Sequence, residues 1–194
     1  MRHQLIKRLY EILKTHETKL GYHYLKDTIP QMFTSGVYFF FDKTTPIENN
    51  QFKITYIGIT NPNENNRLDK HKKNNNSASS FRESVYKAIP IKFGINGTLS
   101  VNDYIHNLPY IFILINDRED IKNIEQRTIE LISNCNQAIQ IHKPNDEWLG
   151  YSSDKEKVRN SNIWNSNYVK RYNVDNNYSE AMNKLEHYSN RMAN

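Results

Sequence analysis

Residues 36–41 read Gly-Val-Tyr-Phe-Phe-Phe, and residues 56–60 read Tyr-Ile-Gly-Ile-Thr. The first run is apolar and aromatic without alternation, which is typical of a strand buried on both faces. A second strand is predicted over residues 52–57, broken by the glycine that follows, and the polar stretch 42–50 has the composition of a turn. Two strands joined by a loop of this length most simply form an antiparallel hairpin, which we expect at the centre of the fold.

Each predicted strand carries a tyrosine, and the hairpin brings Tyr38 and Tyr56 near one another. Such a pair is consistent with a cross-strand aromatic contact that only stabilises the sheet, and also with two groups that take part in proton transfer. Downstream, Arg67 and His71 are four residues apart and share one face of a predicted helix. Their surroundings are basic, with lysines at Lys70, Lys72 and Lys73. An arginine fork and a lysine cluster suit DNA phosphates, whereas the alternative interpretation is a solvated basic surface.

A further helix is predicted to begin near Ser79 or Ser80, because either residue is a suitable N-cap. Its apolar face consists of Phe81, Val85, Ala88 and Ile89. Arg82 lies in its first turn, where backbone N–H groups also favour an anion. Residues 90–108 look loop-like because they contain two glycines and an asparagine.

The clearest strand candidate covers residues 110–115, and a helix is predicted over 121–133. Glu125 lies at the border of the buried face of that helix, where a carboxylate is either a metal ligand or simply solvated. Farther along, Trp148 and Trp164 stand in polar surroundings. We expect these two tryptophans to anchor their segment to the core rather than to stack on bases.

Both ends of the chain show the pattern of an amphipathic helix. The apolar positions near the N-terminus are Leu5, Ile6, Leu9, Ile12 and Leu13, and those near the C-terminus are Tyr178, Ala181, Leu185, Tyr188 and Met192. For the N-terminal helix, packing on the domain with a solvated far side is favoured over a position beside nucleic acid.

The chain has 194 residues, enough for one domain, and its formal net charge of +5 favours a polyanionic partner without naming one. The single cysteine, Cys135, excludes an intramolecular disulfide framework and a cysteine-based zinc site, and it favours a reducing compartment. No stretch has the length of a membrane span, and the N-terminus lacks the apolar core of a signal peptide. A cytoplasmic protein without a membrane partner is therefore expected.

The two triplets and the residues after them resemble the GIY-YIG nuclease superfamily. Gly36-Val37-Tyr38 corresponds to the first triplet, with valine in place of isoleucine, and Tyr56-Ile57-Gly58 matches the second letter for letter. Both β-branched residues suit a strand equally well. The resemblance implies an α+β fold, in which a small antiparallel sheet of three strands is flanked by helices, and the three predicted strands occur in the matching order.

This comparison leads us to expect a single domain over residues 1–194. Within it, a nuclease core at 33–146 carries an N-terminal helical addition at 1–32 and a C-terminal extension at 147–194. Segments around Ser79-Ser80-Phe81-Arg82, Trp148-Leu149-Gly150 and Ile163-Trp164-Asn165 are also similar to segments in a subgroup that includes small bacterial proteins resembling restriction endonucleases.

The resemblance further implies a set of catalytic residues, which in this chain are Tyr38, Tyr56, Arg67, His71 and Glu125. Either Arg67 or Arg82 is the principal phosphate-contacting arginine, and Glu130 is the fallback for Glu125. Members of the family also have an asparagine after the glutamate; Asn145 is chosen here over Asn134 and Asn136. Lys70, Lys72 and Lys73 are expected to contact DNA.

The implied reaction is metal-dependent hydrolysis of a DNA phosphodiester. Glu125 would hold Mg²⁺ or Mn²⁺, and Tyr56 would act as the general base toward water, assisted by Tyr38 and His71. Because tyrosine has a reference pKa of about 10, Tyr56 would need the positive charge of Arg67, Arg82 and the metal.

Three functions remain open at this point. The first is a restriction-type endonuclease that cuts duplex DNA at specific sites and is a homodimer if its site is a palindrome. The second is a nuclease for repair, mobile elements or particular DNA structures. The third is a DNA-binding protein that keeps the fold without catalysis, which the complete set of catalytic residues disfavours.

Overall fold

The computed structural model describes residues 1–46, 52–61, 67–133, 146–169, 173 and 177–192. Its centre is an antiparallel sheet in the order β1-β4-β2-β3. The strands span His23–Tyr24 (β1), Gly36–Pro46 (β2), Phe52–Thr60 (β3) and Pro109–Leu114 (β4). The α+β class and the hairpin of β2 and β3 are therefore as expected, whereas the prediction of three strands is wrong by one. The additional strand, β1, has only two residues, which is too short for a recognisable alternation.

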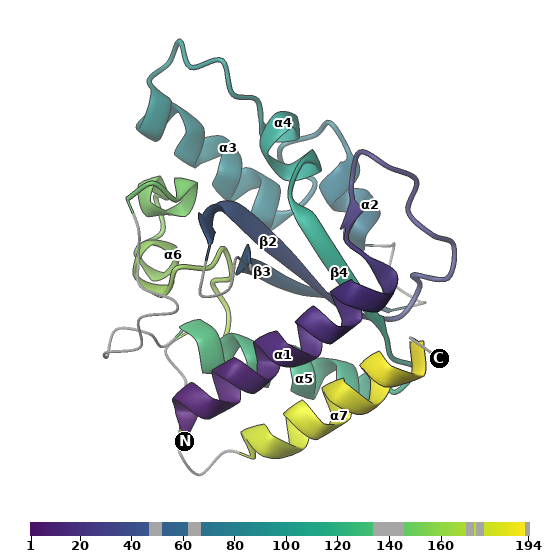
Figure 1. Cartoon of the computed structure of the whole chain (residues 1–194). Helices are drawn as coiled ribbons and strands as arrows, with labels where there is room; N and C mark the ends of the chain where they lie inside the picture. Colours follow the sequence, from purple (N-terminus) through teal and green to yellow (C-terminus); the bar gives the residue numbers. More distant parts are fainter. Residues whose placement is uncertain (47–51, 62–66, 134–145, 170–172, 174–176, 193–194) are drawn as a thin grey trace.

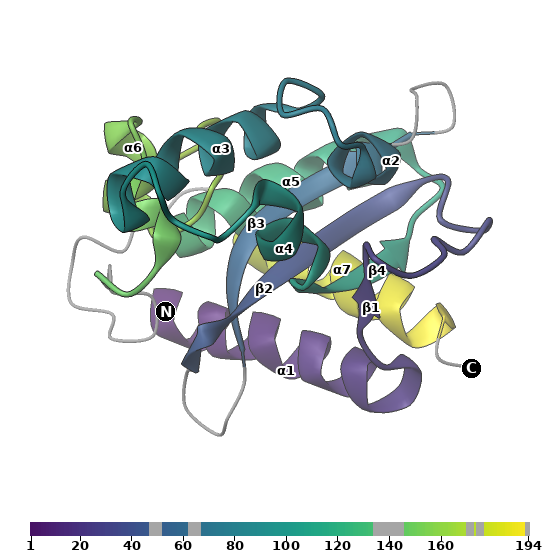
Figure 2. The ribbon, with the colours of Figure 1, turned by 90° about the horizontal axis from the view of Figure 1, so that it is seen from above.

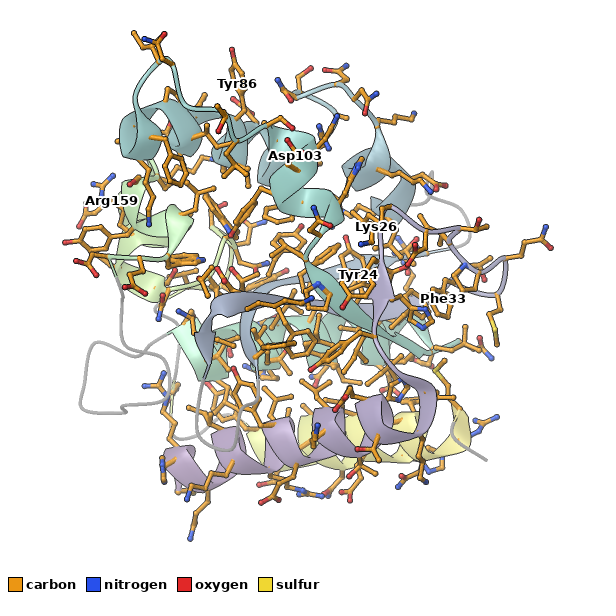
Figure 3. All side chains as sticks on the ribbon, turned by 45° about the horizontal axis from the view of Figure 1, so that its top comes forward. Tyr24, Lys26, Phe33, Tyr86, Asp103 and Arg159 are labelled. Carbon is orange, nitrogen blue, oxygen red and sulfur yellow. The ribbon has the colours of Figure 1, made fainter. Side chains whose placement is uncertain are left out.

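Two layers of helices enclose the sheet (Figure 1). One layer contains α1 (Arg2–Leu20), α5 (Arg118–Ser133) and α7 (Tyr178–Met192), and the other contains α2 (Arg67–Lys72), α3 (Ser80–Phe93) and α4 (Val101–His106). Seen from above, α2, α3 and α4 lie in front of the strands (Figure 2). Two short helices, η3 (Leu149–Ser152) and α6 (Glu156–Ser161), lie beside α3. Figure 3 shows Tyr86 of α3 and Asp103 of α4 on the side of the sheet that faces away from α1 and α7.

Alternation along β2 divides the interior into two hydrophobic clusters. Val37, Phe39 and Phe41 pack with α1, α5 and α7, while Tyr38 and Phe40 face α2, α3 and α4. All five side chains are buried, as predicted for a strand covered on both faces. Because both tyrosines of the triplets belong to the second cluster, the strand period places them on one face of the sheet.

Several predicted boundaries are wrong. β2 continues to Pro46, so residues 42–46 belong to a strand rather than a turn, and β3 passes through Gly58 to Thr60 instead of ending before it. Pairing explains both differences, because Asp42 is in register with Lys53 and Tyr38 with Gly58. The backbone hydrogen bonds between β2 and β3 outweigh the low strand propensity of glycine.

The predicted loop at 90–108 is mostly helical. α3 continues through Pro90 to Phe93, and α4 forms behind a capping box of Ser100 and Asp103. The Ser100 side chain accepts a hydrogen bond from the N–H of Asp103, whose carboxylate accepts one from the backbone of Ser100. This reciprocal cap satisfies two N–H groups and stabilises a short helix that the neighbouring glycines made unlikely on composition alone.

The predicted terminal helices are confirmed. The five apolar positions chosen in the N-terminal helix are all buried in α1, and the side chains of Tyr178, Ala181 and Leu185 are buried in α7. Trp148 and Trp164 are buried as predicted, with their indole N–H groups bonded to Thr55 and Tyr104. In the part of the chain that the structure describes, no helix is both long and apolar enough to cross a membrane. The proposed limits of a nuclease core within the chain stay a prediction.

Candidate active site

The two triplets build one face of the hairpin, and their glycine is part of that geometry. Tyr38 is opposite Gly58, and Phe40 is opposite Tyr56, so the two tyrosine rings lie diagonally with centroids 6.2 Å apart. A Cβ placed on Gly58 would overlap the Tyr38 ring. Glycine at this position therefore lets the first tyrosine lie flat against the neighbouring strand.

Tyr56 is held between aromatic rings. Its ring stacks on Phe81 of α3 with a centroid distance of 4.5 Å and an interplanar angle of 4°, and His71 meets it edge-on at 5.4 Å. Stacking and edge contacts of this kind restrict ring orientation beyond the effect of burial alone. The hydroxyl of Tyr56 consequently has a defined direction.

His71 lies on α2 and joins the first tyrosine to the start of α3. Its Nε2 is 2.9 Å from the Tyr38 hydroxyl, and its Nδ1 is 2.9 Å from Ser79 Oγ. Ser79 is also the N-cap of α3, as one of the two predicted candidates, and accepts the N–H of Arg82. Burial lowers the pKa of His71 to about 3, with further lowering by nearby Arg67, Arg82 and Lys70. The imidazole is therefore neutral at physiological pH and acts as a hydrogen-bonding group.

A cavity of about 210 Å³ opens at the outer edge of β3. Tyr56, Arg67 and Glu125 all line it, although they come from β3, α2 and α5 respectively. Since α2 and α5 cover opposite faces of the sheet, the free edge of β3 is where their side chains meet. The structure thus brings together a hydroxyl, a guanidinium and a carboxylate that the sequence separates by as many as 69 positions.

The environment of Tyr56 opposes its ionisation in the free protein. Burial raises the pKa of Tyr56 to about 12, even though Arg67 and a hydrogen bond from Tyr38 lower it, and Glu125 raises it further. Burial also raises the pKa of Tyr38 well above its usual value. The expectation that positive charge would compensate for a high reference pKa is therefore not met by the protein alone, because desolvation outweighs Arg67.

Arg82 has a different environment from Arg67. It does not line the cavity at β3, and its buried guanidinium donates to the backbone oxygens of His71 (2.7 Å) and Asn75 (3.2 Å) and to Asn102 Oδ1 (2.6 Å). These bonds brace the connection between α2 and α3. Of the two arginines, Arg67 is the one that lines the cavity.

Glu130 and the three lysines of the predicted DNA contact do not line the cavity. Glu130 is buried, where it accepts hydrogen bonds from Arg127 (2.8 Å) and from the hydroxyl of Tyr178 (3.3 Å). Asn145, with its alternatives Asn134 and Asn136, lies outside the described residues. Lys70 and Lys72 are partly exposed and Lys73 is exposed, and the ammonium of Lys72 donates to the carbonyl of Asp27.

Lys155 and Asn165 are among the cavity residues that the sequence reasoning missed. Asn165 donates from Nδ2 to the oxygen of Ile57 (2.7 Å) and accepts the N–H of Ile57 at Oδ1 (2.9 Å), so it pairs with the strand edge beside Tyr56. The N–H of Trp164 bonds the oxygen of Thr55, on the other side of Tyr56. For Asn165 the sequence signal was the similarity noted at Ile163-Trp164-Asn165, and that similarity assigned no function to the residue.

The cavity suits a hard divalent cation bound with the substrate. Among its described lining residues Glu125 is the only carboxylate, and no cluster of three metal-ligating side chains occurs in the described ranges. Mg²⁺ keeps several waters and commonly takes only one or two protein carboxylates together with substrate phosphate oxygens. A single carboxylate in a polar cavity therefore fits such an ion, and Glu125 is the residue that would hold it.

A family model described as GIY-YIG domain matches residues 95–192, about half of the chain. The matched part begins after both triplets and includes β4, α5, α6 and α7, and with them Glu125, Lys155 and Asn165. No curated protein and no solved structure matches. The triplets and the matched part are thus independent indications of the same family.

Proposed function

The chain belongs to the GIY-YIG family, and on that premise we propose that it is a metal-dependent endonuclease that hydrolyses duplex DNA at specific sites. Membership indicates a nuclease, and members of the family generally require a divalent metal. The observation that carries the proposal is the cavity at the edge of β3, where Tyr56, Arg67 and Glu125 meet.

Each of these side chains has a distinct part in the proposed reaction. Arg67 binds non-bridging oxygens of the scissile phosphate through its planar fork. Tyr56 accepts a proton from the attacking water, whose oxygen bonds to phosphorus as the bond to the 3′ oxygen breaks. The leaving 3′ oxygen takes a proton from solvent water, so the products carry a 5′ phosphate and a 3′ hydroxyl. A Mg²⁺ or Mn²⁺ ion held by Glu125 would neutralise charge on the phosphate and on the leaving oxygen.

The remaining residues support Tyr56. Tyr38 donates a hydrogen bond toward Tyr56, while its own oxygen contacts His71 Nε2, and Ser79 holds the other ring nitrogen. All three hydrogen bonds form if the Ser79 hydroxyl donates to His71 Nδ1 and the protonated Nε2 of His71 donates to the Tyr38 oxygen. The Tyr38 hydroxyl is then left to donate to Tyr56, so each hydroxyl donates once. Because the Tyr56 oxygen accepts this hydrogen bond, its anionic form is favoured, and part of the rise in pKa that burial causes is offset.

The test is incubation of the purified protein with long duplex DNA and Mg²⁺ or Mn²⁺, beside a chelator control. We expect discrete, metal-dependent fragments, and no cutting by the Tyr56→Phe or Glu125→Ala protein, each with a melting temperature close to that of the original protein. Nicks or branch-dependent products would instead indicate a repair, mobile-element or structure-specific nuclease. Salt-sensitive binding without any cutting would indicate a non-catalytic DNA-binding protein.

Specific cutting also has consequences for assembly. If the recognised site is a palindrome, a homodimer with two-fold symmetry would match it. The lysines at 70, 72 and 73 follow Arg67 on α2 and its continuation, so we propose that this segment contacts the DNA backbone beside the cavity.

A further inference from the structure

We propose that Lys155 is a second phosphate-contacting residue of the nuclease site, in addition to Arg67. This proposal rests on the proposed nuclease function, since it assigns to Lys155 a phosphate of the same bound DNA. Lys155 lies in the C-terminal part of the chain, far from both triplets, yet it lines the cavity that contains Tyr56, Arg67 and Glu125.

Hydrogen bonds fix the ammonium at the cavity. Lys155 precedes the first residue of α6, and its Nζ donates to Ser84 Oγ on α3 at 3.0 Å. Ser84 Oγ in turn donates to the oxygen of Ser80, at 2.8 Å, and Ser80 is itself a lining residue. The charge of Lys155 is therefore held beside the first turn of α3 rather than free to follow solvent.

Two carboxylates lie near Lys155, but neither forms an ion pair with its ammonium. The nearby carboxylates of Glu83 and Asp154 both pair with Lys87, at 2.8 and 3.6 Å. In the described part of the chain the Lys155 ammonium forms no ion pair, and its hydrogen bond goes to the neutral hydroxyl of Ser84. The ammonium is attracted to Glu83 without forming an ion pair with it, so an arriving phosphate would be the first anionic group in direct contact with it among the described residues.

The chemistry of the lysine side chain defines the expected contact. An ammonium has three donors and no acceptor, and it binds a phosphate as a point charge without the planar geometry of arginine. Because Glu125 is committed to the metal in the proposed site, the cavity presents Arg67 and Lys155 to the DNA backbone. Two cations from different elements, α2 and the start of α6, suit successive phosphates of one strand.

The experiment compares Lys155→Gln with Lys157→Gln, because Lys157 is exposed on α6, which begins directly after Lys155, and does not line the cavity. Binding of a fluorescent DNA duplex is measured in EDTA as a function of salt, and cleavage is measured separately in Mg²⁺. Loss of one phosphate contact changes the slope of log K against log salt by about 0.9. We expect this change, together with at least a tenfold loss of cleavage, in Lys155→Gln only.

The role of the charge itself is tested with Lys155→Arg, which keeps the positive charge and should retain the original salt slope. Equal slopes and equal cleavage rates in Lys155→Gln and the original protein would overturn the assignment. A protein that never cuts DNA would refute the nuclease proposal alone, because the salt slope in EDTA still reports whether Lys155 contacts phosphate.

Discussion

Replacement of Asn165 by alanine removes both hydrogen bonds that hold the backbone of Ile57, next to Tyr56. Ile57 is 0 % exposed and Asn165 is 8 % exposed, so the N–H and C=O released by the change lie in a buried place. An unpaired buried polar group costs about 1–3 kcal/mol, and two give about 2–6 kcal/mol. Water entering from the adjoining cavity would recover part of this, so we expect a loss of about 2–4 kcal/mol.

This loss has a measurable thermal effect. For a chain of this size each kcal/mol shifts the melting temperature by about 2–4 °C, so the Asn165→Ala protein should melt about 5–15 °C lower. Cleavage measured well below that melting temperature should show a lower kcat, of order 10²-fold, because a displacement of about 1 Å at a catalytic group has that effect. KM for DNA should change little, since Arg67 and the lysines remain in place.

A matched control separates loss of stability from misplacement of Tyr56. Asn177 precedes α7 and accepts the N–H of Glu180 at 3.1 Å, and it does not line the cavity. Asn177→Ala should therefore lower the melting temperature while leaving kcat near its original value. The reasoning would be refuted if Asn165→Ala melted like the original protein, or if both variants lost kcat to the same degree.

Two further predictions concern the tyrosines. Gly58→Ala places a methyl group against the Tyr38 ring, and overpacking of this kind should lower the free energy of unfolding by about 1–3 kcal/mol. The denaturant midpoint and kcat should fall with it. A fully stable and active variant would contradict the packing argument. Because the pKa of Tyr56 is raised to about 12, only about one molecule in 10⁵ holds the phenolate at pH 7. The ionised fraction rises about tenfold per pH unit, so log kcat/KM, which reports groups of the free enzyme, should climb with a slope near one between about pH 6 and 8, and a flat profile would exclude this base. His71, with a pKa of about 3, should add no inflection in that range.

Local patterns explain why much of the fold was predictable. The aromatic run at 36–41 and the strand before Gly58 specify a hairpin, and the alternation of side chains places Tyr38 and Tyr56 on one face. In contrast, α4 was missed because two glycines nearby outweighed the capping box of Ser100 and Asp103, although that signal is also local.

The sequence by itself determined the family resemblance, the pair of tyrosines, and the choice of Arg67 and Glu125 as candidates, because these depend on residue type and short spacing. Only the tertiary structure decided that Arg82 braces a loop, and that Asn165, 108 positions after Ile57, completes the strand edge beside Tyr56. The physical reason is that a hydrogen bond between distant residues depends on how the two helical layers and the C-terminal segment pack around the free edge of β3. Neither periodicity nor propensity records that arrangement.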